Sequence, residues 1–299
     1  MQKKEAPQSF TSYQNNQPDY SSPKISTLNV TGNSLKIISW NIFMLPRFVL
    51  RTGQLKRAHE IVNVLKDEDA DIIVFQEAFD TCARKIIRKG LLPHFPYESG
   101  DPPKNIAWKT NSGLWVLSKI PFMVVKHLYF INGKGPDWFA CKGAILIQSE
   151  KNGFAFQLIG THLQSDFGGK ESHGIRALQC EQIRKELIES FAEEGVPQFL
   201  AGDFNTIHHE SENYEQIMSI LQAKQFSLHG DYTYSYDHTA NDLIKGIKNK
   251  PQLIDYILYT GNSYQMPDAR MFINVFRKQW HQKFQDLSDH FAIAGIFQF

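Results

Sequence analysis

The sequence predicts one α/β (α+β) domain, built on short β-strands, that follows a polar N-terminal segment. A chain of 299 residues, of which 42% are hydrophobic, can bury a core large enough for one sizeable domain. Short apolar runs recur along this chain and alternate with segments of helical periodicity. Residues 1–33 are rich in Gln, Asn, Ser, Pro and Tyr and show neither period. We therefore expect a flexible segment at 1–33 and the folded domain at 34–299.

The predicted elements follow one another in a regular alternation. The first strand is predicted at 35–40, and residues 54–66 have the apolar spacing of a helix. Further strands are predicted from apolar runs at 71–75, 114–117, 143–148, 154–159, 198–201, 253–259 and 291–297. A second helix is predicted at 175–191, with an apolar stripe that we assign to the core. This stripe consists of Leu178, Ile183, Leu187, Ile188 and Phe191.

Most of the predicted strands are bordered by polar residues that are capable of chemistry. These residues are Asn41, Glu77, His162, Asp203, Asn205, Asp289 and His290. Strand ends hold side chains rigidly, while the adjoining loops admit a substrate. We therefore expect these side chains to line one shared cleft.

The residue types point to a metal and a general base. Hard oxygen ligands such as Glu77 and Asn41 suit Mg²⁺. Asp289, which precedes His290, could fix the tautomer of the imidazole and raise its basicity. Each residue taken singly also has a structural explanation: Asp203 and Asn205, for example, equally suit an Asx turn. The joint occurrence of all of them in one chain favours the functional interpretation.

Asp255 differs from these residues because it interrupts an otherwise apolar strand. A buried carboxylate is costly unless it is bonded, so we expect a partner such as a catalytic histidine or backbone amides. The alternative is a strand that turns this side toward solvent.

Composition excludes several classes of protein. A formal net charge of +1 argues against a global attraction to nucleic acid. Three cysteines are too few for a disulfide framework, although one bridge could form, and none has the spacing of a zinc site. No apolar run approaches the roughly 18 residues of a spanning helix, and the opening residues lack the apolar stretch of a secretory signal. We expect a soluble protein without a stable nucleic-acid partner.

Together, the motifs resemble those of the endonuclease/exonuclease/phosphatase superfamily of metal-dependent phosphodiesterases. The matching motifs are Trp40-Asn41, Gln76-Glu77, Thr161-His162, Gly202-Asp203-Phe204-Asn205, Ile254-Asp255-Tyr256 and Ser288-Asp289-His290. Within this superfamily the chain is most similar to the neutral sphingomyelinases, especially the bacterial type. That narrower resemblance rests on residues 41–47, 77–80, 135–137, 142–143 and 161–164.

The resemblance implies a fold, a reaction and residue roles. The fold would be the deoxyribonuclease-like four-layer sandwich, with two central, mostly antiparallel β-sheets flanked by helices. The reaction would be Mg²⁺-dependent hydrolysis of sphingomyelin to ceramide and phosphocholine, and Mn²⁺ or Co²⁺ could replace Mg²⁺. Glu77 resembles the principal metal ligand, with Asn41 nearby, and His290, paired with Asp289, resembles the base.

The resemblance also implies contacts to the substrate. His162, Asn205 and Lys142 would contact or stabilise the phosphate, Asp203 would orient water or metal, and Asp255 would support the histidines. Asp137 and Gln164 are expected at the substrate as well.

Aromatic residues are candidates for contact with the membrane that holds such a substrate. Trp138 and Phe139 follow a Gly-Pro-Asp loop, and exposed aromatics on a loop can seat at a lipid interface. Family members often carry an aromatic hairpin for membrane adsorption, and here the matching stretch holds Phe276, Trp280 and Phe284. The spacing of these three could equally describe one buried face of a helix.

Other functions remain open from the sequence. A nuclease or a phosphoinositide phosphatase of the same superfamily is the main alternative, and a binding module without chemistry is a further one. We expect a monomer that acts on a sphingolipid at the bilayer surface. The resemblance implies secretion, although no signal peptide is visible.

Overall fold

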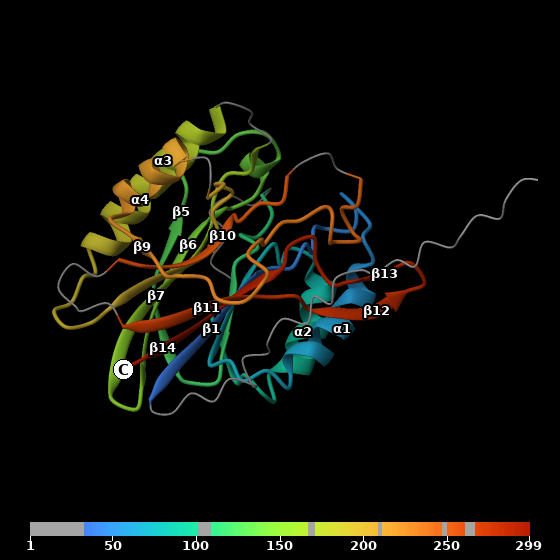
Figure 1. The fold of residues 1–299 in the computed structure, drawn as a ribbon, viewed down its shortest axis with the longest axis horizontal. Coiled ribbons are helices and arrows are strands. Elements are labelled where there is room, and N and C mark those ends of the chain that lie inside the picture. The colour runs from blue at the N-terminus through green and yellow to red at the C-terminus, as the bar shows by residue number, and fades with distance from the viewer. Residues whose placement is uncertain (1–32, 101–108, 167–170, 209–210, 247–249, 261–266) are drawn as a thin grey trace, which may run out of the picture.

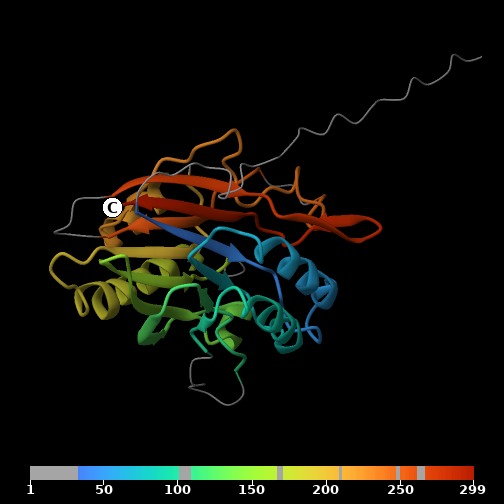
Figure 2. The same ribbon diagram turned by 90° about the horizontal axis from the view of Figure 1, so that it is seen from below.

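The computed structural model describes residues 33–100, 109–166, 171–208, 211–246, 250–260 and 267–299. The predicted flexible segment at 1–33 lies outside these residues, except for Asn33. The region 34–299 forms two six-stranded sheets with helices on their outer faces (Figures 1 and 2).

Each six-stranded sheet has one parallel pair of strands at its centre. The first sheet has the order β11 (Asp268–Asn274), β14 (Ala292–Gln298), β1 (Ser34–Asn41), β2 (Ile72–Gln76), β4 (Trp115–Ser118) and β3 (Tyr97–Glu98). The second has the order β5 (Phe122–Tyr129), β6 (Gly143–Lys151), β7 (Phe154–His162), β8 (Gln198–Asp203), β10 (Asp255–Tyr259) and β9 (Lys224–Gln225). Only β1 with β2 and β7 with β8 run parallel among these pairs. The prediction of mostly antiparallel sheets is therefore confirmed.

Helices cover the outer face of each sheet. Helices α1 (Gln54–Leu65) and α2 (Thr81–Leu91) lie side by side on the first sheet. Helices α3 (Glu171–Ile183) and α4 (Ser211–Leu221) lie together on the second sheet, on the far side of the molecule (Figure 1). The order helix, sheet, sheet, helix is the expected four-layer sandwich.

The alternation of side chains along the strands explains the two cores. In β1, Ile37 belongs to the core between the sheets, whereas its neighbour Ile38 belongs to the core under α1 and α2. In β2, Ile72 and Ile73 divide in the same way. Successive strand residues point to opposite faces, and both faces of this sheet are covered, so apolar residues stand next to each other in these strands.

The second helix differs from its prediction. Helix α3 begins at Glu171, and a π-helix, η4 (Arg184–Glu189), takes over after Ile183. Ile183, Leu187 and Ile188 are buried as expected, but Leu178 is 45% exposed and is not a core residue. Cys180 is buried instead, because positions 178 and 183 lie on different faces of a regular α-helix, whereas 180 and 183 share one face.

The stretch with Phe276, Trp280 and Phe284 is a hairpin and not a helix. Strand β12 (Arg277–His281) pairs with β13 (Phe284–Asp286), so the helical alternative is wrong. This hairpin projects beside α1 (Figure 1). The three residues were spaced like a helix face only because a turn separates two of them.

Two smaller expectations concern membranes and disulfides. Among the described residues, no helix is both long enough and apolar enough to span a membrane. Cys82, Cys141 and Cys180 are all free thiols, so the one bridge that the sequence allowed is absent.

Candidate active site

Strand register brings the candidate residues together at the carboxyl ends of the two parallel pairs. In the first sheet, Asn41 ends β1 and Glu77 directly follows β2. In the second sheet, His162 ends β7 opposite Asp203, the last residue of β8, and Asp203 in turn pairs with Asp255 on β10. The Asn41 Nδ2 atom donates a hydrogen bond across the sheets to Asp203 Oδ2 at 3.0 Å. The expected shared site is therefore formed between the two sheets.

Glu77 lacks the partners that an enclosed carboxylate needs. Its φ of 55° lies in the left-handed region, which residues other than glycine rarely adopt. The Oε2 atom is buried without a hydrogen-bond partner among the described residues. Burial raises the pKa of Glu77 to about 7, and the negative charge of Asp289 adds to this rise. Burial also raises the pKa of Asp289.

The expected pair of Asp289 with His290 is wrong, because another carboxylate holds the imidazole. His290 Nδ1 lies 2.8 Å from Asp255 Oδ2, in a buried hydrogen bond. Asp289 instead accepts a hydrogen bond from Ser288 Oγ at 3.2 Å and lies near Glu77. The side chains of neighbouring residues diverge, so position 289 serves the first sheet and position 290 the second. The separate prediction that Asp255 bonds a histidine is confirmed.

The imidazole of His290 is surrounded by negative charge. Burial alone would lower its pKa, but the charges of Asp255 and Asp203 outweigh this effect and hold the pKa well above its usual value. Its Nε2 atom lies 3.8 Å from Asp203 Oδ2. Asp255 therefore fixes Nδ1 and leaves Nε2 toward the centre of the site.

Asp203 is the hub of the site. Its Oδ1 accepts the backbone N–H of Asn205 at 2.9 Å, and its Oδ2 accepts Nδ2 of Asn41. Burial alone would raise the pKa of this carboxyl, but His290, His162 and the bond from Asn41 lower it below its ordinary value. Asp203 is thus an ionised carboxylate held by both sheets.

Lys142 and His162 lie on the other side of Asp203 from His290 and form a second group of contacts. Lys142 Nζ is 3.0 Å from His162 Nε2, 3.0 Å from the Leu163 carbonyl and 3.0 Å from Asp137 Oδ1. Burial and the lysine charge hold the pKa of His162 well below its usual value, so its ring is neutral. Its Nδ1 atom is buried without a partner within the described residues.

Two expected substrate residues are engaged with the protein itself. Gln164 is fully buried, and its side chain bonds the backbone N–H and carbonyl of Lys134 at 2.9 and 3.1 Å. This geometry favours a role in holding the loop before Asp137 over contact with substrate. Asn205 Nδ2 donates to the Leu163 carbonyl at 3.2 Å, although this side chain is only half-buried.

The aromatic candidates have different surroundings. Trp138 and Phe139 lie on the 3₁₀ helix η2 (Gly135–Phe139) and are 45% and 57% exposed. Trp280 is half-buried, and its Nε1 donates to the Asp286 carbonyl at 2.8 Å. A Cβ atom at Gly53 would lie 2.3 Å from the Trp280 ring, so this ring packs on the start of α1. Of the three, Trp138 and Phe139 are the ones presented to solvent.

Sequence reasoning missed two residues of the site. Arg57, on α1, is fully buried, and its Nη1 atom donates to the carbonyls of Ile42 at 2.9 Å and Leu287 at 2.8 Å. Tyr236 packs its ring edge on His290 at 5.1 Å. An arginine among the apolar positions of a predicted helix is a signal for the first residue, whereas Tyr236 lies in a loop without a pattern.

The residues present suit a divalent cation at the carboxylate side. Glu77 and Asp289 place two carboxylates together, with the raised pKa values and the unpaired oxygen described above. Asp203, Asp255 and His290 also bring potential ligand atoms within 4.8 Å of one another. However, His290 Nδ1 and Asp255 Oδ2 already bond each other. That group is already linked by this hydrogen bond, although Asp255 Oδ1 is buried without a partner among the described residues, so Glu77 is the first candidate to hold a cation and Asp255 the second.

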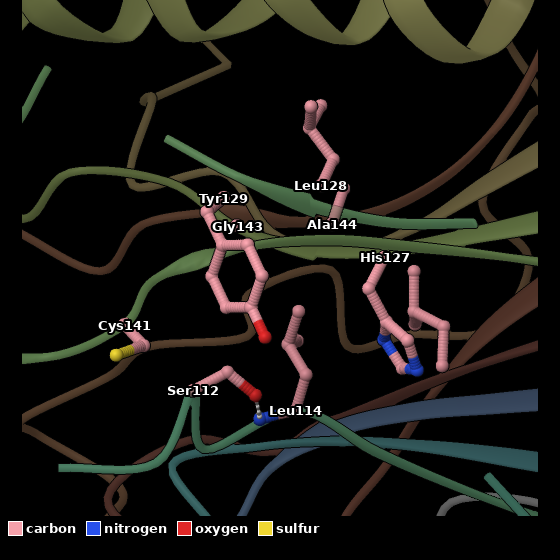
Figure 3. A pocket seen from close by; sticks show the side chains of 9 residues that line it. Ser112, Leu114, His127, Leu128, Tyr129, Cys141, Gly143 and Ala144 are labelled. Carbon is pink, nitrogen blue, oxygen red and sulfur yellow. Dashed lines mark hydrogen bonds between the residues drawn. The ribbon is translucent and has the colours of Figure 1, made fainter. Parts of the chain in front are cut away.

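A small pocket lies apart from these residues. Figure 3 shows His127, Tyr129 and Cys141 lining it, with Ser112, whose Oγ accepts the N–H of Leu114 at 3.1 Å. None of the candidate site residues lines this pocket.

Comparison with known proteins gives related sequences and the same fold. Sphingomyelinase C of Leptospira interrogans is 30% identical over 289 residues, which are 88% of this chain and 51% of that protein. Sphingomyelinase C of Listeria ivanovii is 25% identical over 292 residues, covering 88% and 86% of the two chains. The chain thus spans about half the length of the Leptospira relative and most of the Listeria one.

Solved structures agree with this relationship at the level of the fold. Sphingomyelinase C from Streptomyces griseocarneus has a TM-score of 0.79 at 24% identity, covering 89% of this chain and 100% of that one. A mutant beta toxin of Staphylococcus aureus with bound magnesium ions has a TM-score of 0.80 at 23% identity, with the same coverage.

A family match covers the whole candidate site. Residues 38–290 match the Endonuclease/Exonuclease/phosphatase family, and this range includes every site residue from Asn41 to His290. The resemblance inferred from the motifs is confirmed, and the chain belongs to the endonuclease/exonuclease/phosphatase family.

Proposed function

We propose that this chain is a Mg²⁺-dependent phosphodiesterase that hydrolyses sphingomyelin to ceramide and phosphocholine. The observation that carries the proposal is the convergence of Lys142, His162 and His290 on Asp203, beside Glu77, whose Oε2 atom is buried without a partner among the described residues. This arrangement offers cationic donors, a base and a cation site within one cluster. The relatives named sphingomyelinase C support sphingomyelin as the substrate.

Glu77 would hold the cation, with Asn41 and Asp289 beside it. When bound, a divalent cation compensates the two carboxylates and draws electron density from the phosphoryl oxygens. Oxygen ligands of this kind accept Mn²⁺ and Co²⁺ as well as Mg²⁺, so these ions should substitute. The related fold of beta toxin with bound magnesium ions supports the choice of metal.

His290 would act as the general base in its neutral form. Without a cation the nearby carboxylates hold the pKa of His290 well above its usual value, and a cation bound beside them would lower that pKa. The Nε2 atom of His290 takes a proton from the attacking water, while Asp255 holds Nδ1–H and thereby fixes the tautomer and the ring. The water oxygen bonds to phosphorus, and the bond from phosphorus to the primary oxygen of ceramide breaks. That oxygen takes a proton from solvent, and His290 returns to solvent the proton that it accepted. Phosphocholine and ceramide are the products.

Lys142 and His162 would bind the phosphoryl oxygens, on which charge develops. The lysine supplies a positive charge inside a buried site, where such a charge stabilises an oxyanion strongly. The free Nδ1 of His162 and the amide of Asn205 would donate to the same oxygens. Asp137 and Gln164 would position Lys142 and its loop, since Asp137 forms an ion pair with Lys142 at 3.0 Å.

The test is release of phosphocholine from sphingomyelin in detergent micelles, with Mg²⁺ and with chelator. We expect release that depends on Mg²⁺ and is lost when chelator is added. Phosphatidylcholine, a phosphoinositide and supercoiled plasmid serve as alternative substrates. Plasmid nicking or phosphoinositide dephosphorylation without phosphocholine release would replace this proposal by another activity of the family.

A further inference from the structure

The turn from Pro46 to Leu50 exposes three consecutive apolar side chains beside the candidate site. Phe48, Val49 and Leu50 are 86%, 62% and 45% exposed. Single exposed apolar residues are common on protein surfaces, but three in a row on one turn form a patch that calls for a partner.

This turn, called the 46–50 turn below, is fixed in shape. Inside it, the N–H of Val49 donates to the Pro46 carbonyl at 2.8 Å. At its base, the buried Gln54 donates through Nε2 to the Leu45 carbonyl at 3.0 Å and also bonds the Leu50 carbonyl, so one side chain clamps both ends. A rigid turn loses little conformational entropy when a partner covers it.

The 46–50 turn is also tied to the proposed metal ligand. The N–H of Met44 donates to the Glu77 carbonyl at 3.1 Å, and the N–H of Asp80 donates to the Met44 carbonyl at 2.8 Å. Arg47 then bonds Asp80 through its Nε atom at 2.9 Å. The exposed apolar patch is therefore attached to the loop that follows β2 and carries Glu77.

Charge around the patch suits one kind of partner. The exposed Arg51 follows Leu50, and Arg47, which also pairs with Asp80, precedes Phe48, so an arginine stands at each end of the apolar triplet. Apolar side chains that enter the acyl region while flanking arginines stay at the phosphates are the pattern of an interfacial anchor. The tip of the β12–β13 hairpin, by contrast, consists of the exposed polar residues His281, Gln282 and Lys283.

We propose that the 46–50 turn inserts into the phospholipid bilayer and holds the Glu77 side of the site at the membrane surface. This inference rests on the proposed function, because it assumes that the substrate lies in a bilayer. Together with Trp138 and Phe139 near Lys142, it gives the site one apolar contact from each sheet.

The test compares two double variants with matched exposure. Val49→Ser/Leu50→Ser removes apolar residues that are 62% and 45% exposed, and Met123→Ser/Leu178→Ser removes residues of the same exposure on β5 and α3, away from the site. Binding to phosphatidylcholine vesicles is measured by co-sedimentation with chelator present. We expect the turn variant to bind roughly tenfold or more weakly and the control variant to bind like the parent. Equal binding by both variants would overturn the proposal.

Three further measurements keep the inference separate from the proposed function, from folding and from self-association. The turn variant and the parent should hydrolyse a soluble phosphocholine ester at the same rate. If the parent does not hydrolyse this ester, the proposed function is refuted, but the proposal that the turn binds the membrane is not. Phe48→Trp should gain fluorescence that brominated lipids quench, and an unquenched Trp on bound vesicles would contradict insertion. If sedimentation equilibrium shows a dimer that the turn variant abolishes, the patch is a contact between two copies and the lipid proposal is wrong.

Discussion

The two ends of the candidate site are built on opposite principles. At the carboxylate end, Glu77 and Asp289 stand close together, and Glu77 keeps an unpaired buried oxygen. At the histidine end, Asp255, His290 and Asp203 form a connected series, from the 2.8 Å bond of Asp255 to the bonds that hold Asp203. Each end keeps one buried carboxylate oxygen without a partner among the described residues, Glu77 Oε2 and Asp255 Oδ1, but only the histidine end has a carboxylate that bonds an imidazole.

This difference assigns a task to each end. Unpaired carboxylates destabilise the protein until a cation compensates them, so the carboxylate end is organised to bind metal. A bonded histidine is held in one orientation, so the histidine end is organised to move a proton. Four variants or conditions can break or sharpen this contrast.

Removing the base should have the largest effect. We expect His290→Gln to lower kcat by roughly 10²–10⁴-fold at saturating Mg²⁺, because a general base contributes about that factor. The Mg²⁺ concentration for half-maximal activity should change little. Steady-state kinetics with a soluble phosphocholine ester measures both quantities, and a kcat within a few-fold of the parent would refute the role of His290.

Changing the metal ligand should affect stability and activity in opposite directions. The folded-state pKa of Glu77 is raised from 4.5 to about 7, so the metal-free protein loses stability from this group as the pH rises through that window. Glu77→Gln removes this loss, so the free energy of unfolding of the metal-free protein should rise by about 1–3 kcal/mol at pH 8. We expect a higher Tm than the parent at pH 8, a smaller difference at pH 5, and activity that Mg²⁺ no longer restores.

Asp203→Asn is the matched control for that experiment. Its carboxylate is held by donors, and its pKa is lowered, so the substitution should reduce Tm at pH 8. The Asp203 variant should have a lower Tm than the parent in the absence of metal. If the Glu77→Gln protein also has a lower Tm than the parent, the contrast between the two ends is wrong.

Arg57 supports the carboxylate end, because it bonds the segments next to Asn41 and Asp289 and its charge acts on Asp289 and Glu77, so its substitution should have an intermediate effect. Lysine retains the positive charge but lacks the planar guanidinium group with which Arg57 bonds the carbonyls of both Ile42 and Leu287. We expect Arg57→Lys to lower kcat by about tenfold and stability by about 1–3 kcal/mol. Arg51→Lys, at an exposed arginine just before α1, should match the parent in kinetics and in chemical denaturation.

The smallest effect on chemistry should come from the aromatic residues of η2. Trp138→Ala/Phe139→Ala should slow hydrolysis of sphingomyelin in vesicles several-fold, because apolar area that seats at the interface is lost. The same variant should cleave a soluble ester at the parental rate. Equal losses on both substrates would argue that these side chains support Lys142 and do not contact lipid.

The sequence predicts the structure well where the neighbours of a residue along the chain determine its environment. Asp255 stood out because it interrupts an apolar strand, and its expected histidine partner is present. The fold was predictable because strands buried on both faces are continuously apolar, as in Ile72 and Ile73.

The sequence was misleading where partners are distant along the chain. Adjacency suggested Asp289 as the partner of His290, but the true partner comes from β10, and only strand register reveals it. The helical spacing of Phe276, Trp280 and Phe284 could not disclose the turn that makes them a hairpin. Leu178 does not belong to the buried stripe, because positions 178 and 183 lie on different faces of the regular α-helix α3.

Crystals soaked in Mn²⁺ provide the most direct measurement of the central claim. An anomalous difference map locates this cation independently of any activity. The account predicts a peak bonded to the Glu77 carboxylate, on the side of Asn41 and Asp289, with the bond between Asp255 and His290 intact. A peak coordinated by Asp203, Asp255 and His290, with Glu77 unbound, would contradict it.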